Sequence, residues 1–591
     1  MHSLIQYHTL PSWGRLLQIA VPGAALFIIV SWWLHRTLLT TRYPKNLPRL
    51  GQKEGVSWKD MRQRYMDDSL SMFNHIYENY SKKGIAVLIP VFGSCDEVIL
   101  PNSSLQWLAR QPDNVASSMQ AQIDNICLDY TLGHEYAHDP WGGELVKTGL
   151  NPTLDAVCAV MNPEAVAGVD DVLGQPDDWK EIPLFPTCRA LLGRVTLAFT
   201  LGDSPEGRKL CRDPDFVAVC YAVLDAMLGA AGDLAGVRPA LRPLYGVWAA
   251  RPVKAKLADM RRRFAPLYRE RLALVDGQAA GEKKAAEEPR DLLQMLMRHA
   301  AAHRPRELRS LDAMTRRLAV SNFGSMHQSV LTLHNLILDV VGSDAGHGTV
   351  SALRGEVARV ILGGSSDADV YDPATHTWTR AKAAALVRAD SCARETQRVH
   401  SFLGRAVQRR VVAPSGLVTE DGVRLPRGAM VSVLTHQAQT DGELLPAETC
   451  DDSSSNSSSS GPEVYDPFRF ARPRLAAAAD TDAGAQRPAA LGHLSFAATG
   501  PDYLPFSHGR HACPGRFFVD VELKMVLAAL LMKYDVEFPE DYGGKRPPNV
   551  WFAGFGIPPW RRRCGCAGGV QRRRAWCRLG GCKALSWYRV L

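Results

Sequence analysis

The chain has 591 residues, of which 46% are hydrophobic and 22% charged, the values of a globular protein rather than a disordered or fibrous one. Its 13 cysteines are scattered without paired spacing, which argues against a disulfide-stapled secreted domain. The formal net charge is +8, but nine lysines and arginines and no acid follow Trp560, so the rest of the chain is nearly neutral. A basic excess confined to one terminus excludes a general affinity for nucleic acid.

The first predicted element is an apolar helix over Leu16–Leu34, 19 residues without a formal charge. That length just crosses the ~30 Å hydrocarbon core of a bilayer. Trp32 and Trp33 are residues that favour the membrane interface. No small-residue cleavage site follows, so residues 1–42 are predicted to be a retained anchor, with a buried core helix as the alternative. The two prolines of residues 43–50 predict a stiff hinge.

After the hinge, the sequence predicts a small sheet followed by many helices. Trp58–Tyr80 has the spacing of amphipathic helix, and Gly84–Leu100 predicts strands. Asn102–Ser118 predicts a short helix and loop whose Trp107 belongs to the core. Residues from about Pro186 to Leu274 are rich in helical patterns that would roof a pocket.

His134 and His138, in H-E-Y-A-H, have the spacing of a zinc-binding helix. Asp139-Pro140 follows at once, and a proline disfavours helical geometry at the residue before it. We therefore expect the helix to stop before it can present both imidazoles, and we predict no zinc site.

The most informative stretch is Phe506–Gly515, F-S-H-G-R-H-A-C-P-G, which ends just before an apolar run with helical spacing. This predicts a tight loop that presents the sulfur of Cys513 at a helix N-terminus. Free backbone N–H groups and the helix dipole there favour a thiolate, which suits proximal ligation of haem iron. A lone cysteine would more simply be a buried structural thiol, but the whole pattern is present.

This loop closely resembles the haem-binding loop of the cytochrome P450 family, F-x-x-G-x-R-x-C-x-G. The resemblance implies that haem b is the cofactor and that Cys513 is the metal ligand, bound to its iron as a thiolate. His511 stands at the arginine position, where it can still donate a hydrogen bond to a haem propionate. The cofactor-binding residues implied are Phe506, Gly509, His511, Cys513 and Gly515. Lys147 is a weaker candidate for a propionate contact.

Two further motifs occur in the order that the family has. Glu395 and Arg398 form E-x-x-R on one face of a predicted helix, and Arg469 lies in Y-D-P-F-R-F, which resembles F-x-P-x-R-F. The resemblance implies that these three form a buried structural network behind the cysteine loop. Buried charges need such mutual pairing, and guanidinium forks suit a carboxylate.

Leu311–Val341 predicts one long helix, and in this family the long central helix crosses the haem with (A/G)-G-x-(D/E)-T-(T/S). Here the acid is replaced by His327 and the threonine by Gln328, as in kaurene-oxidase-like fungal variants. The resemblance implies that His327, Gln328 and Ser329 line the oxygen side as catalytic residues, and His327 could relay protons. Alternatively, His327 and Gln328 only satisfy each other's hydrogen bonds.

The fold predicted from this resemblance is mainly α with a small β-rich lobe, the haem-thiolate fold of cytochrome P450, preceded by one N-terminal transmembrane helix. One domain would span residues 51–560, with a low-complexity insertion at 451–461. Residues 561–591 form a basic tail rich in cysteine and glycine, which we expect to be disordered.

The function implied is a fungal microsomal monooxygenase that inserts one oxygen atom from O₂ into a hydrophobic small molecule, a secondary metabolite such as a terpenoid or polyketide. Electrons would come from NADPH through cytochrome P450 reductase, with cytochrome b5 as an optional donor. The catalytic domain would face the cytoplasm at the endoplasmic reticulum membrane, in contact with lipid and not with nucleic acid. Two alternatives stay open: a haem-thiolate isomerase or dehydratase without reductase, and a non-catalytic haem-binding membrane protein.

Overall fold

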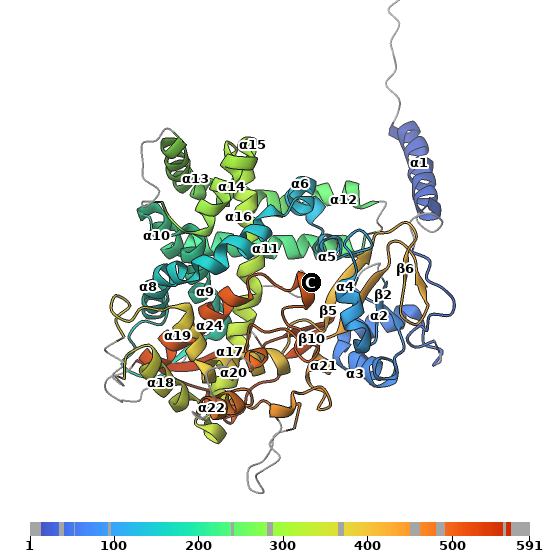
Figure 1. The fold of residues 1–591 in the computed structure, drawn as a ribbon. Coiled ribbons are helices and arrows are strands. Elements are labelled where there is room, and N and C mark those ends of the chain that lie inside the picture. Colours follow the sequence, from blue (N-terminus) through green and yellow to red (C-terminus); the bar gives the residue numbers. More distant parts are fainter. Residues whose placement is uncertain are drawn as a thin grey trace, which may run out of the picture.

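The computed structural model describes most of the chain (Figure 1), namely residues 13–34, 41–52, 54–92, 96–237, 241–279, 288–364, 371–449, 461–479, 491–559 and 563–568. The predicted low-complexity insertion, apart from Gly461, lies outside these residues.

The fold is mostly helical. Its helices are α1 (Trp13–Leu34), α2 (Trp58–Asp67), α3 (Ser69–Asn79), α4 (Leu105–Arg110), α5 (Ser118–Ile126), α6 (His134–His138), α7 (Trp141–Leu145), α8 (Leu154–Leu173), α9 (Leu184–Leu201), α10 (Pro205–Arg212), α11 (Pro214–Ala235), α12 (Arg242–Ala249), α13 (Arg251–Ala279), α14 (Leu292–His303), α15 (Pro305–Leu308), α16 (Leu311–Ser325), α17 (His327–His347), α18 (Thr349–Val360), α19 (Arg380–Ala385), α20 (Val387–Val399), α21 (His436–Gln439), α22 (Ala471–Ala479) and α24 (Arg516–Lys533).

The strands of the described residues form one five-stranded sheet, one three-stranded sheet and two two-stranded sheets. They are β1 (Val87–Pro90), β2 (Asp96–Ile99), β3 (Ala116–Ser117), β4 (Lys180–Pro183), β5 (Arg405–Val411), β6 (Leu417–Val418), β7 (Arg424–Leu425), β8 (Met430–Leu434), β9 (Tyr534–Glu537), β10 (Val550–Phe552), β11 (Phe555–Ile557) and β12 (Arg563–Gly568).

The five-stranded sheet has the order β1-β2-β8-β5-β3, and it lies beside α2, α3 and α4 on the opposite side of the molecule from α8 and α10 (Figure 1). β1 and β2 are antiparallel with Val87 opposite Ile99, whereas β2 and β8 are parallel with Glu97 opposite Met430. The predicted strands within Gly84–Leu100 are therefore confirmed. Trp107 of α4 is partly buried and packs against the core beneath this sheet.

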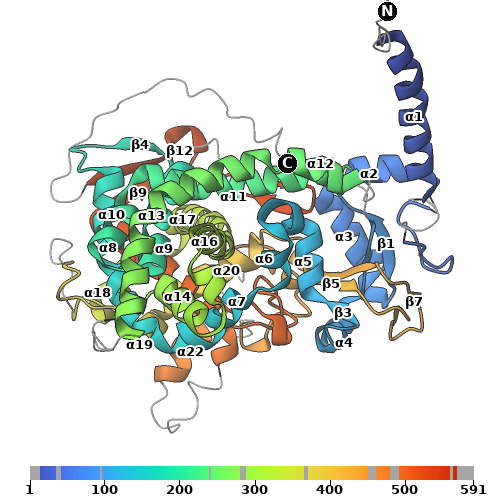
Figure 2. The ribbon, with the colours of Figure 1, turned by 90° about the horizontal axis from the view of Figure 1, so that it is seen from above.

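The larger core lies among the helices, where Figure 2 shows α16 and α17 nearly end-on in the middle of the helical part. α24 is apolar over almost its whole circumference, and such a helix is stable only when other helices cover it on every side. α9 and α11 are apolar enough to cross a membrane by length and composition. Because 78% and 56% of their apolar windows are buried inside the fold, they are core helices instead.

α1 projects from the rest of the fold in both views (Figures 1 and 2). It runs from Trp13 to Leu34, three residues longer at its start than predicted, and continues through Pro22. Its apolar stretch Val21–Val30 is exposed. The hinge is shorter than expected, because Leu47 and Leu50 are already buried in the core and the carbonyl of Pro48 accepts a hydrogen bond from Leu88 N–H at 2.8 Å.

The long central helix predicted over Leu311–Val341 is divided into α16 and α17 at Met326. Three serine hydroxyls in this region each bond the carbonyl four residues earlier, a contact that bends helices. These are Ser321, Ser325 and Ser329, bonded to Arg317, Ser321 and Ser325 at 3.1, 3.0 and 2.7 Å. Gly324 lies inside the same turn and weakens it further.

The expectation of a disordered tail from residue 561 is wrong for residues 563–568. They form β12, which lies between β4 and β9 in a three-stranded antiparallel sheet. Cys564 is opposite Ile182, and Cys566 is opposite Val536. A strand with partners on both sides belongs to the folded domain, so the domain extends at least to Gly568.

Glu522 joins three core helices. It lies on α24 with no exposed surface, accepts a hydrogen bond from Thr196 of α9 at 2.5 Å, and lies beside the hydroxyl of Ser329 of α17. Burial raises the pKa of this carboxyl to about 8, although the two hydroxyls oppose the shift. Glu522 is therefore protonated in the folded protein at neutral pH, so the junction contains no buried charge.

Replacing Glu522 by glutamine should flatten the dependence of stability on pH. The folded protein keeps this proton up to about pH 8, whereas the unfolded chain releases it near the ordinary glutamate value of 4.5. The free energy of unfolding therefore falls as pH rises through that window. In Glu522→Gln we expect the fall, measured by urea unfolding, to be smaller by about 1–3 kcal/mol. The exposed Glu463→Gln is the control, and equal slopes in Glu522→Gln and the parent would contradict this assignment.

Candidate functional site

A cavity of ≈ 2310 Å³ lies between the junction of α16 and α17, the loop of Cys513, β5 and the segment from α5 to α7. Its lining is largely apolar, with a few polar side chains at defined places. Apolar lining residues include Leu132, Phe199, Leu296, Val320, Phe323, Leu331, Leu504 and Phe518. Cavities of this kind, with a small number of polar groups, are typical of sites for hydrophobic small molecules.

The cysteine loop forms one wall of this cavity. Its backbone closes on itself where Cys513 N–H donates to the carbonyl of Phe506 at 2.8 Å. The ring of Phe506 meets Phe496 edge-on with centroids 5.2 Å apart, which fixes the start of the loop. Gly509 has φ +75°, a conformation that favours glycine, and a Cβ there would lie 3.3 Å from Ala109, which is a tight contact. Four of the five predicted cofactor-binding residues line the cavity, namely Phe506, His511, Cys513 and Gly515, and Gly509 does not.

The thiol of Cys513 is partly buried just before the N-terminus of α24. Burial raises its pKa, and the backbone N–H groups of Gly515 and Arg516 and the charge of Arg516 lower it without overcoming that effect. The expectation that the helix N-terminus by itself favours a thiolate is therefore not met. A bound cation at the sulfur would supply the missing stabilisation, because thiolates form readily as metal ligands.

The structure brings Glu395, Arg398 and Arg469 together. The guanidinium of Arg398 donates to both oxygens of Glu395 at 2.7 and 2.8 Å, and Nε of Arg469 donates to Oε1 at 3.0 Å. All three are buried, with at most 5% of their surface exposed. Asp466 N–H adds a fourth hydrogen bond to the same carboxylate at 3.1 Å.

Gln439 connects this network to the cysteine loop. Its carbonyl accepts a hydrogen bond from Arg398 at 2.9 Å, and its side-chain amide donates to the carbonyl of Arg398 at 3.0 Å. Its side-chain oxygen accepts from Leu504 N–H at 2.8 Å, two residues before Phe506. The sequence did not identify Gln439. This residue ends α21, and only the tertiary fold places it between Arg398 and Leu504.

Arg394, next to the motif glutamate, was also missed. It is buried between the rings of Phe470 and Tyr503, with its guanidinium carbon 4.5 and 4.0 Å from their centroids. It donates to the carbonyls of His493 and Ser495 at 3.1 and 2.8 Å. Arg394 thus holds the irregular segment that leads into the cysteine loop.

Arg409 of β5 is a charged residue that lies buried in the cavity wall. It is 1% exposed, and burial lowers its pKa to about 10. Its Nη1 donates to the carbonyl of Gln408 at 2.9 Å, but within the described part of the chain Nε and Nη2 have no hydrogen-bond partner. The two unpaired nitrogens of this buried guanidinium can donate to a hydrogen-bond acceptor at this end of the cavity, and a carboxylate would also match its charge.

His511 lies beside Arg409 at the same end of the cavity. Its Nε2 is 2.9 Å from Oδ1 of Asp113, and burial together with the charge of Arg409 lowers its pKa. Lys147, the weaker candidate from sequence, lies at the exposed edge of the cavity wall. Arg409 was not predicted, because nothing in its strand pattern distinguishes it from its neighbour Arg410.

The opposite wall contains the three residues predicted to be catalytic, all of which line the cavity. His327 bonds Asp225 of α11, with 3.0 Å between Nε2 and Oδ1, and Asp225 also accepts from Arg189 at 2.9 Å. The alternative that His327 and Gln328 only satisfy each other is therefore wrong for His327. Gln328 is exposed to the cavity, and Ser329 is buried in contact with Glu522.

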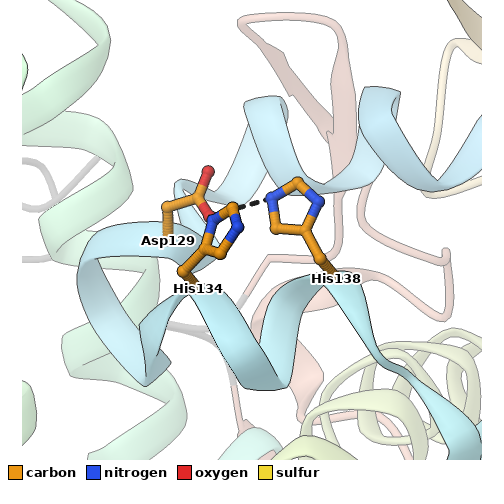
Figure 3. Close-up of side chains that lie close together, drawn as sticks. All are labelled: Asp129, His134 and His138. Atoms are coloured by element: carbon orange, nitrogen blue, oxygen red, sulfur yellow. Dashed lines mark hydrogen bonds and ion pairs between the residues drawn. The ribbon is translucent and has the colours of Figure 1, made fainter.

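The imidazoles of His134 and His138 lie together, although we expected the helix to stop before it could present both. α6 ends at His138, one residue before Asp139, so the proline terminates the helix only after both imidazoles are in place. Figure 3 shows the two rings side by side, facing Asp129. The reason for which we predicted no metal site here is therefore invalid.

Comparison with known proteins agrees with this geometry. A family model described as Cytochrome P450 matches residues 248–562. The cytochrome P450 monooxygenase pbrC of Penicillium brasilianum is 38% identical over 555 residues, covering 93% of this chain and 95% of its own. The monooxygenase astC of Aspergillus terreus is 38% identical with the same coverage, and tenB of Beauveria bassiana is 34% identical over 88% and 90% of the two chains.

Similarity at this level over almost the whole chain, together with the fold and the cysteine loop, settles the class of the protein. It is an oxidoreductase that incorporates molecular oxygen, and its family implies a haem whose iron is held by a cysteine thiolate. The chain belongs to the cytochrome P450 family.

Proposed function

We propose that this protein is a haem-thiolate monooxygenase that inserts one oxygen atom from O₂ into a hydrophobic small molecule of fungal secondary metabolism, such as a terpenoid or polyketide. The observation that carries the proposal is the position of the Cys513 sulfur, in the wall of a large apolar cavity across from the junction of α16 and α17. The fungal relatives support the metabolic setting. A cavity of ≈ 2310 Å³ leaves room for a large substrate beside the cofactor.

The residues present fit haem b at this place. Cys513 would hold the iron, with the N–H groups of Gly515 and Arg516 directed at its sulfur. The unpaired nitrogens of Arg409 would donate to a propionate, with His511 beside them. Bound in this way, the haem supplies the activation of O₂ and the transfer of one oxygen atom to substrate.

On the opposite side, the protein's own residues would handle protons and exclude water. The hydrogen bond between His327 and Asp225 holds the imidazole in one orientation, and His327 lines the cavity. An imidazole held in this way can accept and donate a proton, so this pair can deliver a proton to the cavity in place of the usual acid. Gln328 provides a neutral hydrogen-bonding group for the substrate or for water.

The pair formed by His327 and Asp225 favours the monooxygenase over the isomerase or dehydratase, since oxygen activation has a net uptake of two protons, whereas isomerisation and dehydration have none. Electrons would come from NADPH through cytochrome P450 reductase, with cytochrome b5 as an optional donor. Reductase-dependent consumption of NADPH, coupled to product, separates the monooxygenase from both alternatives.

We further propose that α1 anchors the protein in the endoplasmic reticulum membrane as a single span, with the catalytic domain on the cytoplasmic side. Support comes from the exposed apolar stretch Val21–Val30. A second exposed apolar surface lies on α12, formed by Leu244, Tyr245, Val247 and Trp248. Exposed apolar patches of this kind favour contact with lipid.

Changing Cys513 to serine should abolish the absorption band that is characteristic of a thiolate-ligated haem in the reduced carbon monoxide complex. The hydroxyl of serine cannot supply the sulfur donor, so turnover should fall to background. Cys392→Ser, at a buried cysteine away from the cavity lining, is the matched control and should keep the band. Retention of the band in Cys513→Ser would refute the assigned ligand.

Changing Glu395 to alanine should yield haem-poor, weakly expressed protein. It leaves two buried guanidinium groups uncompensated, a cost of about 3–5 kcal/mol against a typical stability of about 5–15 kcal/mol. His327→Ala, on the oxygen side, should instead keep haem while less product forms per NADPH. Haem per protein and product per NADPH are measured for both variants. A haem-replete Glu395→Ala protein would show that the network does not hold the cysteine loop.

Removing residues 1–42 should shift the protein partly into the soluble fraction while haem binding is retained. The cut lies before Leu47 and Leu50, so the core keeps all of its buried residues. Fractionation of membranes and haem content measure the two effects. We expect the truncated protein to keep some association with membranes through the exposed apolar residues of α12. Replacing these residues by polar ones in the truncated protein should remove that remaining association. Loss of haem on truncation would instead place α1 in the folded core.

A further inference from the structure

We propose that Asp129, His134 and His138 form a binding site for a divalent transition-metal ion of the zinc class, on the outer face of the segment that walls the substrate cavity. The site is separate from the haem-binding loop, and none of its three residues lines the cavity.

The three side chains already converge on one point. Nδ1 of His134 and Nε2 of His138 lie 2.9 and 3.0 Å from the same oxygen of Asp129 (Figure 3). The two imidazole centroids are 4.1 Å apart, and the three candidate ligand atoms all lie within 4.8 Å of one another. Small rotations about the side-chain bonds would place all three around one ion at about 2.0–2.2 Å.

Local backbone geometry explains how the chain builds this cluster. His134 and His138 are one helical turn apart on α6, so both side chains lie on one face. Asp129 begins the widened helical turn η4 (Asp129–Gly133), and Gly133 with φ +112° redirects the chain into α6. Widened turns of this type occur often at functional sites. Glycine at residue 133 therefore brings the carboxylate back over the first turn of α6.

The donor set selects the class of ion. Two imidazoles and one carboxylate suit zinc and its neighbours, whereas magnesium and calcium prefer oxygen ligands alone. Three protein ligands leave a position for water. The imidazole side chain of His134 is 78% exposed, so an ion can reach the site without local unfolding. The same exposure leaves no water-excluding pocket beside Glu135, so we propose binding at this H-E-x-x-H sequence, not hydrolysis.

An ion here would act on the cavity wall. The opposite face of α6 carries Tyr136 and Ala137, which are 7% and 1% exposed and line the cavity together with Leu132. Metal coordination would link the start of η4 to the end of α6 across these residues. The wall segment from 129 to 138 would then open less often, which would slow the exchange of its amide hydrogens.

The first test is zinc titration of the untagged, haem-loaded full-length protein by calorimetry. We expect one site of micromolar affinity that weakens at least about tenfold in His134→Ala and in His138→Ala, and less in Asp129→Asn. Because cysteines after residue 560 are present in every variant, zinc bound there cannot explain a difference. The carbon monoxide spectrum verifies folding, and His134→Gln, which keeps a polar side chain, repeats the test if the alanine variant is unstable.

The matched control is His303→Ala. His299 and His303 of α14 form a second pair of imidazoles one turn apart, with centroids 4.7 Å apart, but no third ligand joins them among the described residues. This variant should bind zinc as the parent does. Equal weakening in His303→Ala and His134→Ala, or unchanged affinity in both His134→Ala and His138→Ala, would overturn the proposal.

The second test is hydrogen exchange of the haem-loaded protein with and without zinc. Amides of residues 130–138 should exchange at least about threefold more slowly with zinc in the parent, and equally with and without zinc in His134→Ala. Magnesium at the same concentration should have no effect. Zinc protection that persists in His134→Ala would show that the ion binds elsewhere, and this too would overturn the proposal.

Discussion

A single buried carboxylate, that of Glu395, neutralises two guanidinium groups that water cannot reach. In a medium of low dielectric, leaving the donors of such charges without acceptors is costly. Arg398 uses its remaining N–H groups on the carbonyls of Gln439 and Pro462, which are 41 and 64 residues away, and Arg469 uses its own on Gly461 and Val464, which are nearer in the chain. The charge of Glu395 thereby holds in place several irregular segments that lack the hydrogen bonding of helices and strands.

The cysteine loop depends on that arrangement. Gln439, which is held by Arg398, receives the N–H of Leu504, and the chain then enters the loop at Phe506. α24 begins three residues after Cys513 and extends to the opposite side of the cavity, where Glu522 meets Ser329 of α17. One helix therefore connects the sulfur to the distal wall. The protonated form of Glu522 keeps this connection free of buried charge.

The wall opposite Cys513 holds its histidine through a second helix. Asp225 on α11 supplies a carboxylate to the imidazole of His327 on α17, so this pair depends on the packing of the two helices. The serine hydroxyls that bond the preceding turn divide α16 from α17 at the cavity.

The sequence by itself determined the loop of Cys513 and the spacing of Glu395 and Arg398, because these depend on turn chemistry and on helical periodicity. The mainly helical fold with its small sheet followed from the family resemblance that these motifs carry. The sequence could not identify Gln439, Arg394 or Arg409, since a single polar residue carries no periodic signal. It also misjudged two local features. Residues 563–568 were expected to be disordered, yet strands β4 and β9 hold them, and Asp139-Pro140 was expected to prevent the pairing of His134 and His138. The first outcome was decided by contacts with strands that are distant in the chain, and the second by a difference of one residue in where α6 ends. Only the tertiary structure contains that information.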